Sequence, residues 1–462
     1  MHRAAAASLS IFAIALAVRV AWIVTLPETL VWADEHEFVS VARHLASGDG
    51  YVSGSYRANP VLPGYLAVVF RLFGEHYLVA RLGQAFMGAL TCVLVAATAT
   101  RLLDARVGLV SGLLMAVYLP HVYLSGVFYV ECIFTLLVAL TLWCAVHVLD
   151  DTPRRPWLLA TGASFALASL ARPIFLAYLP ALVAALVWAM RAPLVRRLAS
   201  AGLMVGSIGL MILPWTLRNY YVLGTPVVVS TGFGTKLWQG NNEGADADPD
   251  DRELFFDQAV WKERVAALPA AERVAVEARY RDAAQRIEAA YAEHGDANLA
   301  YDAVLGPLAV EFIRTHPDRA FALFIRKLGV LFLPFSKTLT TNIDTSSLKR
   351  SAAIAAYIPI LVLALLGAWW CRGRGRGLAL VYGLVASIAG TYAVLTTCTR
   401  FRLPLDPYLV MFAAAALVEL AMRSSSATHA LRTPPAANAA RSIDLAPGKP
   451  LSEGAHSHRR EV

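Results

Sequence analysis

The feature that most constrains this chain is a series of apolar runs that recurs from the N-terminus to residue 422. Many runs reach about 18 residues, enough for a helix to cross a bilayer. Because 57% of the 462 residues are hydrophobic and 16% are charged, a soluble fold is disfavoured. The pattern predicts an all-α polytopic membrane protein with about ten transmembrane helices. The expected spans are 8–27, 78–100, 107–124, 127–149, 157–171, 174–190, 198–217, 352–371, 378–397 and 405–422.

Basic residues gather in four short turns between these runs, at 101–106, 152–155, 191–197 and 371–376. The positive-inside rule places such turns in the cytoplasm. Alternation then puts both termini in the cytoplasm and loop 28–77 outside. The Lys and Arg residues of these turns account for the net charge of +8. We expect no nucleic-acid partner, because no basic segment is interleaved with aromatic residues that could stack on bases.

Two regions depart from the apolar pattern. Segment 252–294 is rich in Ala, Glu and Arg with apolar residues at helical spacing, which predicts two or three surface helices broken at Pro269. The run 320–335 is short and carries Arg326 and Lys327 in its middle, so it suits an interfacial helix better than a span. The expected regions are a transmembrane core (1–227) with its first external loop (28–77), an external and mostly helical region (228–319), the interfacial helix with the C-terminal spans (320–422), and a disordered cytoplasmic tail (423–462).

This topology places an unusual set of charges on the outer face. Ionisable residues at membrane depth are costly to bury and are therefore candidates for a functional site. The acids are Asp34 and Glu35, which open the first external loop, and Glu131 at the start of a span. The other candidates are Glu37, Arg172, Arg218, Lys236, His316, Arg326, Lys327, Arg400 and Arg402.

Structural explanations stay open for several of these residues. Arg172 and Arg218 could snorkel from helix ends to lipid headgroups. Glu131 could be a buried partner for an arginine. Glu37 fits a solvated charge and Lys236 fits a plain loop residue. A functional site is favoured because carboxylates and arginines converge on one face of a chain that carries few charges.

Carboxylates together with arginines suit the transfer of a sugar from a lipid phosphate. A carboxylate can take the proton of the acceptor. Arginines can stabilise the charge that develops on the departing phosphate, in a site with little water. A nucleotide-sugar enzyme would instead need a Rossmann-like domain, and the sequence has no strand–helix alternation with a Gly-rich loop.

Several sequence blocks, in this order, resemble the GT-C-fold membrane glycosyltransferases of the protein-mannosyltransferase-like and aminoarabinose-transferase-like superfamily, including rhizobial galacturonosyltransferase-like members. The resemblance covers about 1–420 and rests on the order and sidedness of the blocks. They are DEHEFVSVARHLASGDGY (34–51), NPVLPGYLAVVFRLFG (59–74), ARLGQAFMG (80–88), YLPHVYLSGVFYVE (118–131), LARP (170–173), PWTLRNYYVLGTPV (214–227), GNN (240–242), HPDRAFALFIRK (316–327) and RFRLPLDP (400–407).

The resemblance implies a polyprenyl-phosphate sugar donor and an external active site. Asp34, with Glu35, would contact or deprotonate the acceptor. Arg172, Arg218 and Arg400 would hold the donor phosphate. Lys327, Arg402 and His316 match a helix pattern and are weaker candidates for the same site. Some relatives bind a divalent metal near the first loop; here the sequence offers only the acids and histidine of 34–37, so metal binding is left open.

These observations predict an integral membrane hexosyl- or pentosyltransferase in the bacterial plasma (inner) membrane. It would move a sugar from a polyprenyl-phosphate donor to a lipid, glycan or protein acceptor on the external, periplasmic face. Two alternatives remain: a transporter or flippase of a lipid-linked sugar, and an O-antigen-type ligase or polymerase with a pyrophosphate-linked donor. The apolar spacing of Phe38, Val41, Ala42 and Leu45 predicts a surface helix after Asp34.

Overall fold

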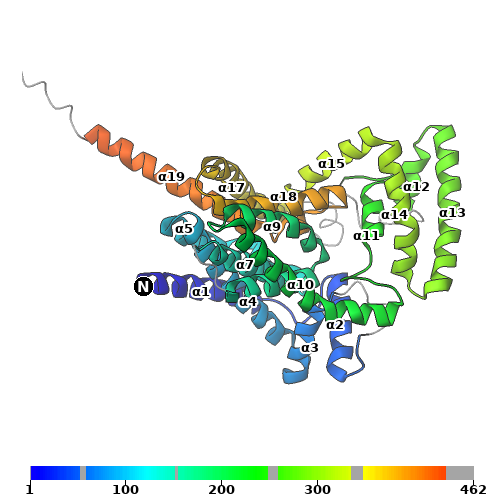
Figure 1. Ribbon diagram of the computed structural model, residues 1–462, viewed down its shortest axis with the longest axis horizontal. Helices are drawn as coiled ribbons and strands as arrows, with labels where there is room; N and C mark the ends of the chain where they lie inside the picture. Colours follow the sequence, from blue (N-terminus) through cyan, green and yellow to red (C-terminus); the bar gives the residue numbers. More distant parts are fainter. Residues whose placement is uncertain (1, 52–58, 151–154, 248–258, 335–346, 433–462) are drawn as a thin grey trace, which may run out of the picture. The chain divides into compact units, whose positions relative to one another are not determined.

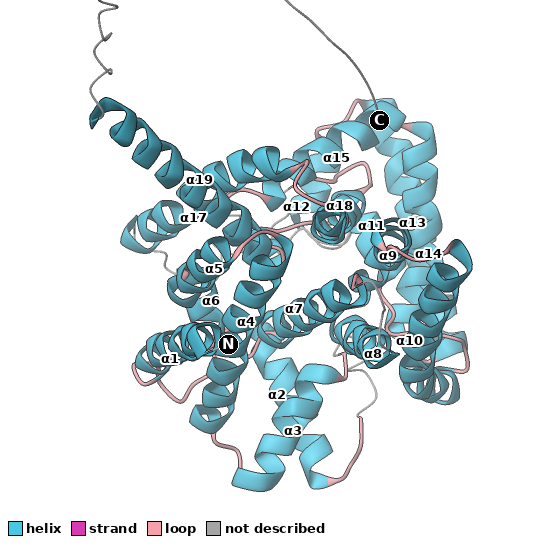
Figure 2. Ribbon diagram, turned by 60° about the vertical axis from the view of Figure 1, so that its left-hand side comes forward, coloured by secondary structure: helices cyan, strands magenta, loops and turns pink. Residues whose placement is uncertain are grey.

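The computed structural model describes residues 2–51, 59–150, 155–247, 259–334 and 347–432. In these ranges the chain forms helices joined by loops, without strands (Figure 2). Contacts group residues 1–418 into one compact unit and 419–462 into another. The elements considered below belong to the first unit, apart from the end of the last helix.

The N-terminal half is built on one long helix, α4 (Tyr77–Leu102), which packs against α1, α5 and α7 (Figure 1). The row continues as α7 packs on α8 and α8 packs on α10. Small residues allow the close approach: a Cβ on Gly112 of α5 would overlap Ala96 of α4. The partners are α1 (His2–Ile23), α5 (Ala105–Val117), α7 (Val130–Val148), α8 (Arg155–Ala171) and α10 (Leu194–Leu223).

Among the described residues, seven helices are long and apolar enough to cross a membrane, which identifies a multi-pass membrane protein. They lie at Ala5–Ile23, Tyr77–Leu102, Val130–Val148, Leu194–Leu223, Ile354–Cys371, Arg376–Val394 and Asp406–Ser424. The other three expected spans correspond to the shorter helices α5, α8 and the pair η1 (Pro173–Tyr178) and α9 (Leu179–Ala189). The predicted all-α membrane fold is confirmed. Its C-terminal helices are α17 (Ser347–Cys371), η3 (Arg376–Leu378), α18 (Ala379–Val394), η4 (Thr399–Arg402) and α19 (Asp406–Arg432).

The first loop folds into two packed helices, α2 (Ala33–Ser47) and α3 (Val61–Phe73). The helix predicted after Asp34 is present, with Val41 and Ala42 buried. Helix α3 was not separated from the loop in the sequence, because its 13 mostly apolar residues are too few for a span. A six-residue helix, α6 (Leu119–Leu124), connects α5 to α7.

The polar region between spans has its own small core. Helices α11 (Phe233–Gly240), α13 (Ala270–His294) and α14 (Ala297–Thr315) pack together, with α12 (Ala259–Ala266) against α13. Aromatic side chains fill the centre, where the Trp238 indole donates to the Tyr280 hydroxyl. Helix α13 begins directly after Pro269, where the sequence predicts a break.

The structure can be compared with the predictions for the interfacial segment 320–335 and the tail 423–462. Helix α15 (Pro317–Leu331) covers most of the expected interfacial segment and is not among the candidate spans. Helix α19 continues to Arg432, ten residues into the predicted disordered tail, because Arg, Ser and Ala are compatible with a helix. The remainder of that tail, 433–462, lies outside the described residues.

Candidate active site

Four of the predicted site residues meet in one charged cluster: Asp34, Glu131, Arg172 and Arg400. The Arg400 guanidinium lies between two carboxylates, with Nη1 2.7 Å from Asp34 Oδ2 and Nε 3.3 Å from Glu131 Oε1. Arg172 forms an ion pair with the same Glu131 oxygen. Residues 366 positions apart in the sequence thus form one site.

Exposure rises across the cluster. The Glu131 side chain is completely buried, Arg172 is 17% exposed, Arg400 is 23% exposed and Asp34 is 45% exposed. The cluster therefore has one buried carboxylate, Glu131, and one solvent-accessible carboxylate, Asp34. Among the described residues, the only hydrogen bond found for the Asp34 carboxylate uses Oδ2, which leaves Oδ1 for a proton donor.

Helix ends bring these charges together. Asp34 lies in the first turn of α2 and Glu131 in the first turn of α7, where the helix dipole favours negative charge. Arg172 directly follows α8 in an extended conformation, as expected for a residue before a proline. Arg400 lies in η4, just before α19. Four separate elements therefore contribute one side chain each at the same end of the bundle.

Aromatic rings line the two arginines. Arg400 lies over the ring of Tyr129, 4.5 Å from its centre, and Arg172 lies 5.2 Å from the ring of Phe401. Burial alone would lower the pKa of Arg400, but Glu131 and Asp34 outweigh that effect and hold it well above its usual range. The guanidinium therefore stays charged. Neither ring was predicted from the sequence, although each is within two residues of a predicted site residue.

Glu35 has a different position from its neighbour Asp34. Its carboxylate is buried, and Oε2 accepts from the backbone N–H groups of Val31 and Trp32 at 2.9 and 3.0 Å. Oε1 accepts from the N–H of Phe128 at 2.9 Å. The bond from the Trp32 N–H to Glu35 is one half of a capping box. The bond from Phe128 connects the same carboxylate to a distant loop. The catalytic role predicted for Glu35 stays a prediction, and the structure gives it a structural one.

Two predicted phosphate ligands are also turned toward protein groups. Arg402 is 3% exposed and donates to Asp406 Oδ1 at 2.8 Å and to the Leu333 carbonyl at 2.7 Å. Lys327 is 1% exposed, and its Nζ lies within 3.1 Å of the carbonyl oxygens of Gly240, Val394 and Leu395. Neither residue joins the charged cluster in the described part of the chain.

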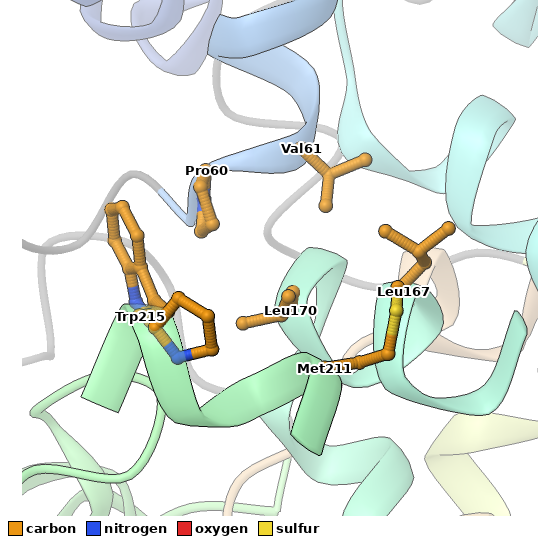
Figure 3. A pocket seen from close by; sticks show the side chains of 7 residues that line it. Pro60, Val61, Leu167, Leu170, Met211 and Trp215 are labelled. Atoms are coloured by element: carbon orange, nitrogen blue, oxygen red, sulfur yellow. The ribbon is translucent and has the colours of Figure 1, made fainter. Parts of the chain in front are cut away.

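Arg218 lies near the C-terminal end of α10, five residues before its last residue and beside an apolar cavity. Its guanidinium lies over the rings of Tyr51 and Trp215, at 5.2 and 5.0 Å. Trp215 also lines the cavity, which has a volume of about 510 Å³ (Figure 3). The other lining residues are Pro60, Val61, Leu167, Leu170, Met211 and Pro214.

The cavity and the charged cluster both include residues at the C-terminal end of α8. Leu167 and Leu170 face the cavity from the last turns of α8, and Arg172 follows immediately after that helix. The predicted arginines therefore divide into two groups, with Arg172 and Arg400 in the cluster and Arg218 beside the cavity. Within the described residues no ion pair connects Arg218 to the cluster.

The remaining candidates lie elsewhere. Lys236 Nζ donates to Gln239 Oε1 within α11. His316 joins α14 to α15 and stacks on Phe312, with the ring centres 5.1 Å apart. Glu37 is exposed on α2.

A metal site does not fit the described residues near the first loop. They contain no group of three or more His, Cys, Asp or Glu side chains placed to bind a metal ion. The two acids of the cluster are both paired with the guanidinium of Arg400, which lies where a bridging cation would be expected. We therefore derive no step through a metal.

The chain is similar to known proteins in part of its sequence and in its fold. The family model for dolichyl-phosphate-mannose-protein mannosyltransferase matches residues 58–216. The apo crystal structure of an oligosaccharyltransferase from Archaeoglobus fulgidus aligns with 92% of this chain at 13% identity and a TM-score of 0.52. The chain has the GT-C fold.

The resemblance stated from the sequence is thus confirmed for the fold, and the family match covers about a third of this GT-C chain. ArnT from Cupriavidus metallidurans, bound to undecaprenyl phosphate, aligns with 93% of the chain and 81% of its own length, at 17% identity and a TM-score of 0.41. The chain spans about half the length of the archaeal oligosaccharyltransferases it matches, 51% in the apo structure. No curated protein sequence matches it significantly.

Proposed function

We propose that this protein is a membrane glycosyltransferase that moves a sugar from a polyprenyl-phosphate donor to a hydroxyl or amine of an acceptor. The observation that carries the proposal is the Asp34–Arg400–Glu131–Arg172 cluster at one end of a GT-C bundle. The family match supports it, because the family is described by a dolichyl-phosphate sugar donor.

In the proposed reaction the acceptor oxygen or nitrogen attacks the anomeric carbon of the sugar. The new bond forms as the bond between that carbon and the phosphate oxygen breaks, and the phosphate leaves with the electron pair. Asp34 takes the acceptor's proton through its accessible Oδ1. Arg400 orients the Asp34 carboxylate and, with Arg172, supplies positive charge to the departing phosphate.

The apolar cavity suits the prenyl chain of this donor. Its walls are formed by α8, α10 and the start of α3, and Arg218 lies at its edge as a partner for a phosphate. A lipid tail in the cavity would bring its head group to the end of α8, where Arg172 begins the cluster. This arrangement favours a lipid-linked donor over a soluble nucleotide sugar.

We place the reaction on the external, periplasmic face of a bacterial plasma membrane, with both termini in the cytoplasm. The basis is the concentration of Lys and Arg in the turns at the other ends of the spans. We expect the region 228–319 to help select the sugar and the class of acceptor (lipid, glycan or protein).

The test is the substitution Asp34→Asn, assayed for transfer from a labelled polyprenyl-phosphate sugar in membranes. We expect at least a 100-fold loss of transfer, because positioned acid–base groups contribute about 10²–10⁴-fold. Glu28→Gln is the matched control, since Glu28 is an exposed acid of the same loop, and it should retain wild-type activity. Full activity in Asp34→Asn would overturn the assignment of the base. Lipid-sugar translocation by the wild type without any transfer would favour the flippase alternative.

A further inference from the structure

The turn that carries Arg400 is anchored on its N-terminal side by Lys327 of α15. The Lys327 ammonium has three N–H groups. Three carbonyl oxygens accept from it: Leu395 at 2.8 Å, Gly240 at 3.0 Å and Val394 at 3.1 Å. These carbonyls belong to the C-terminal ends of α11 and α18, where helix dipoles favour a cation. Lys327 thus connects three helices immediately before the turn.

Helix α11 and the end of α18 are in very close contact at Gly240. Gly240 lies so close to the Leu395 carbonyl that a Cβ on it would overlap that oxygen. The same added atom would come within 2.9 Å of Lys327 Nζ. The close approach of α11 to the end of α18 therefore requires glycine here, and it holds the ammonium between the two helix ends.

The same turn is anchored on its C-terminal side by the last residue of α15, one turn beyond Lys327, and by the residues that follow it. Arg402 donates to the carbonyls of Leu331 and Leu333, at the end of α15, and to the Asp406 carboxylate. Asp406 in turn accepts from the Tyr118 hydroxyl at 3.0 Å. Helix α15 therefore holds both sides of the segment 394–406, and Arg400 lies in the middle of that segment.

We propose that Lys327 is a positioning residue, which fixes the segment 394–406 so that Arg400 reaches both Asp34 and Glu131. The inference rests on the proposed function for its consequence on activity, but not for its consequence on structure. Direct binding of the donor phosphate by Lys327 is disfavoured, because the side chain is 1% exposed and its three N–H groups are already matched by carbonyls. Lys327 acts through Arg400, without touching the substrate.

The first experiment measures backbone amide hydrogen exchange in the purified full-length protein, comparing wild type with Lys327→Met. Methionine keeps the length of the apolar stem and removes all three donors. We expect exchange in 396–405 to increase at least tenfold, with exchange in α4 and α7 unchanged. Arg326→Met is the matched control, because Arg326 is the neighbouring, exposed cation of α15. Unchanged exchange in Lys327→Met would overturn the inference, whether or not the protein is a glycosyltransferase.

The second experiment measures kcat and the donor KM for lipid-linked sugar transfer. In Lys327→Met we expect kcat to fall about 10- to 100-fold, since a misplacement of about 1 Å in a site can cost that much. The donor KM should change less than twofold. Lys327→Gln, which keeps two N–H donors, should lie between wild type and Lys327→Met and serves if the methionine variant does not fold.

A double variant separates positioning from direct binding. If Lys327 acts through Arg400, then Lys327→Met should cost little further activity in the Arg400→Ala background. Fully additive losses, or a raised donor KM with unchanged kcat, would overturn the inference. Absence of transfer by the wild type would instead contradict the proposed function and leave the exchange result to decide the structural role.

Discussion

The neighbouring carboxylates of Asp34 and Glu35 have different surroundings and different expected roles. Asp34 is 45% exposed and ion-paired, whereas Glu35 is 1% exposed and accepts three backbone N–H groups. Their order along α2 explains the difference, because successive helix positions point about 100° apart. The sequence motif alone treats the two acids as equivalent, because it does not show that the distant Phe128 N–H lies beside Glu35.

This division predicts the behaviour of Glu35→Gln. The amide can replace one carboxylate oxygen, but its NH₂ group would face a backbone N–H. We expect a loss of about 1–3 kcal/mol in the free energy of unfolding, the cost of leaving buried groups unpaired. The measurement is thermal unfolding of the purified protein in detergent.

The control for this prediction is Glu28→Gln, which changes an exposed acid of the same loop and should unfold like the wild type. A Glu35→Gln protein with wild-type stability and no transfer activity would contradict the structural role. It would restore Glu35 as a catalytic candidate.

The basic residues show what sequence can and cannot provide at this scale. Arg172 and Arg400 were predicted to share a site because both fall at the outer ends of spans, and they do share the Glu131 carboxylate. Lys327 and Arg402 carry the same charge on the same expected face, yet their partners are mainly backbone carbonyls of distant elements. Hydrophobic periodicity contains no information about such partners.

At the scale of elements, α10 is the clearest case of one helix with two functions. Its middle is apolar and long enough to span a membrane, and its last turns carry Trp215 and Arg218 at the edge of the cavity. The span and the arginine were predicted from the sequence. The cavity was not, because α3, which forms one wall, is too short to be recognised as a membrane-spanning apolar run.

The cavity yields a prediction for Met211→Trp. A larger side chain at this half-exposed lining position should obstruct the donor lipid and raise the donor KM about fivefold to tenfold, which corresponds to about 1–1.4 kcal/mol. The measurement is the initial rate of transfer as a function of donor concentration. The effect should shrink for a donor with a short prenyl chain.

Leu210→Trp is the matched control, because Leu210 is the adjacent, 72% exposed residue of α10 and does not line the cavity. It should leave the donor KM unchanged. Equal effects from both tryptophans, or no effect from Met211→Trp with a long-chain donor, would contradict the assignment of the cavity to the prenyl chain.

At the scale of the whole molecule, the apolar runs predicted the architecture well, because each expected span corresponds to a helix. Bilayer thickness sets the length of such helices, so the signal is strong in a single sequence. The segments between spans were predicted less completely. Helices α11, α13 and α14 bury their own aromatic core, and α15 connects that region to the turn of Arg400. These contacts depend on side chains far apart in the sequence.

We propose that this molecule breaks the bond between a sugar and a polyprenyl phosphate. The most direct measurement uses purified protein in liposomes with a polyprenyl-phosphate sugar and a membrane extract as the source of acceptor, with products followed by mass spectrometry. This proposal predicts that the wild type releases one polyprenyl phosphate for each sugar transferred, and that Asp34→Asn releases at least 100-fold less. Movement of the intact donor across the bilayer without its cleavage, or equal cleavage by both proteins, would contradict it.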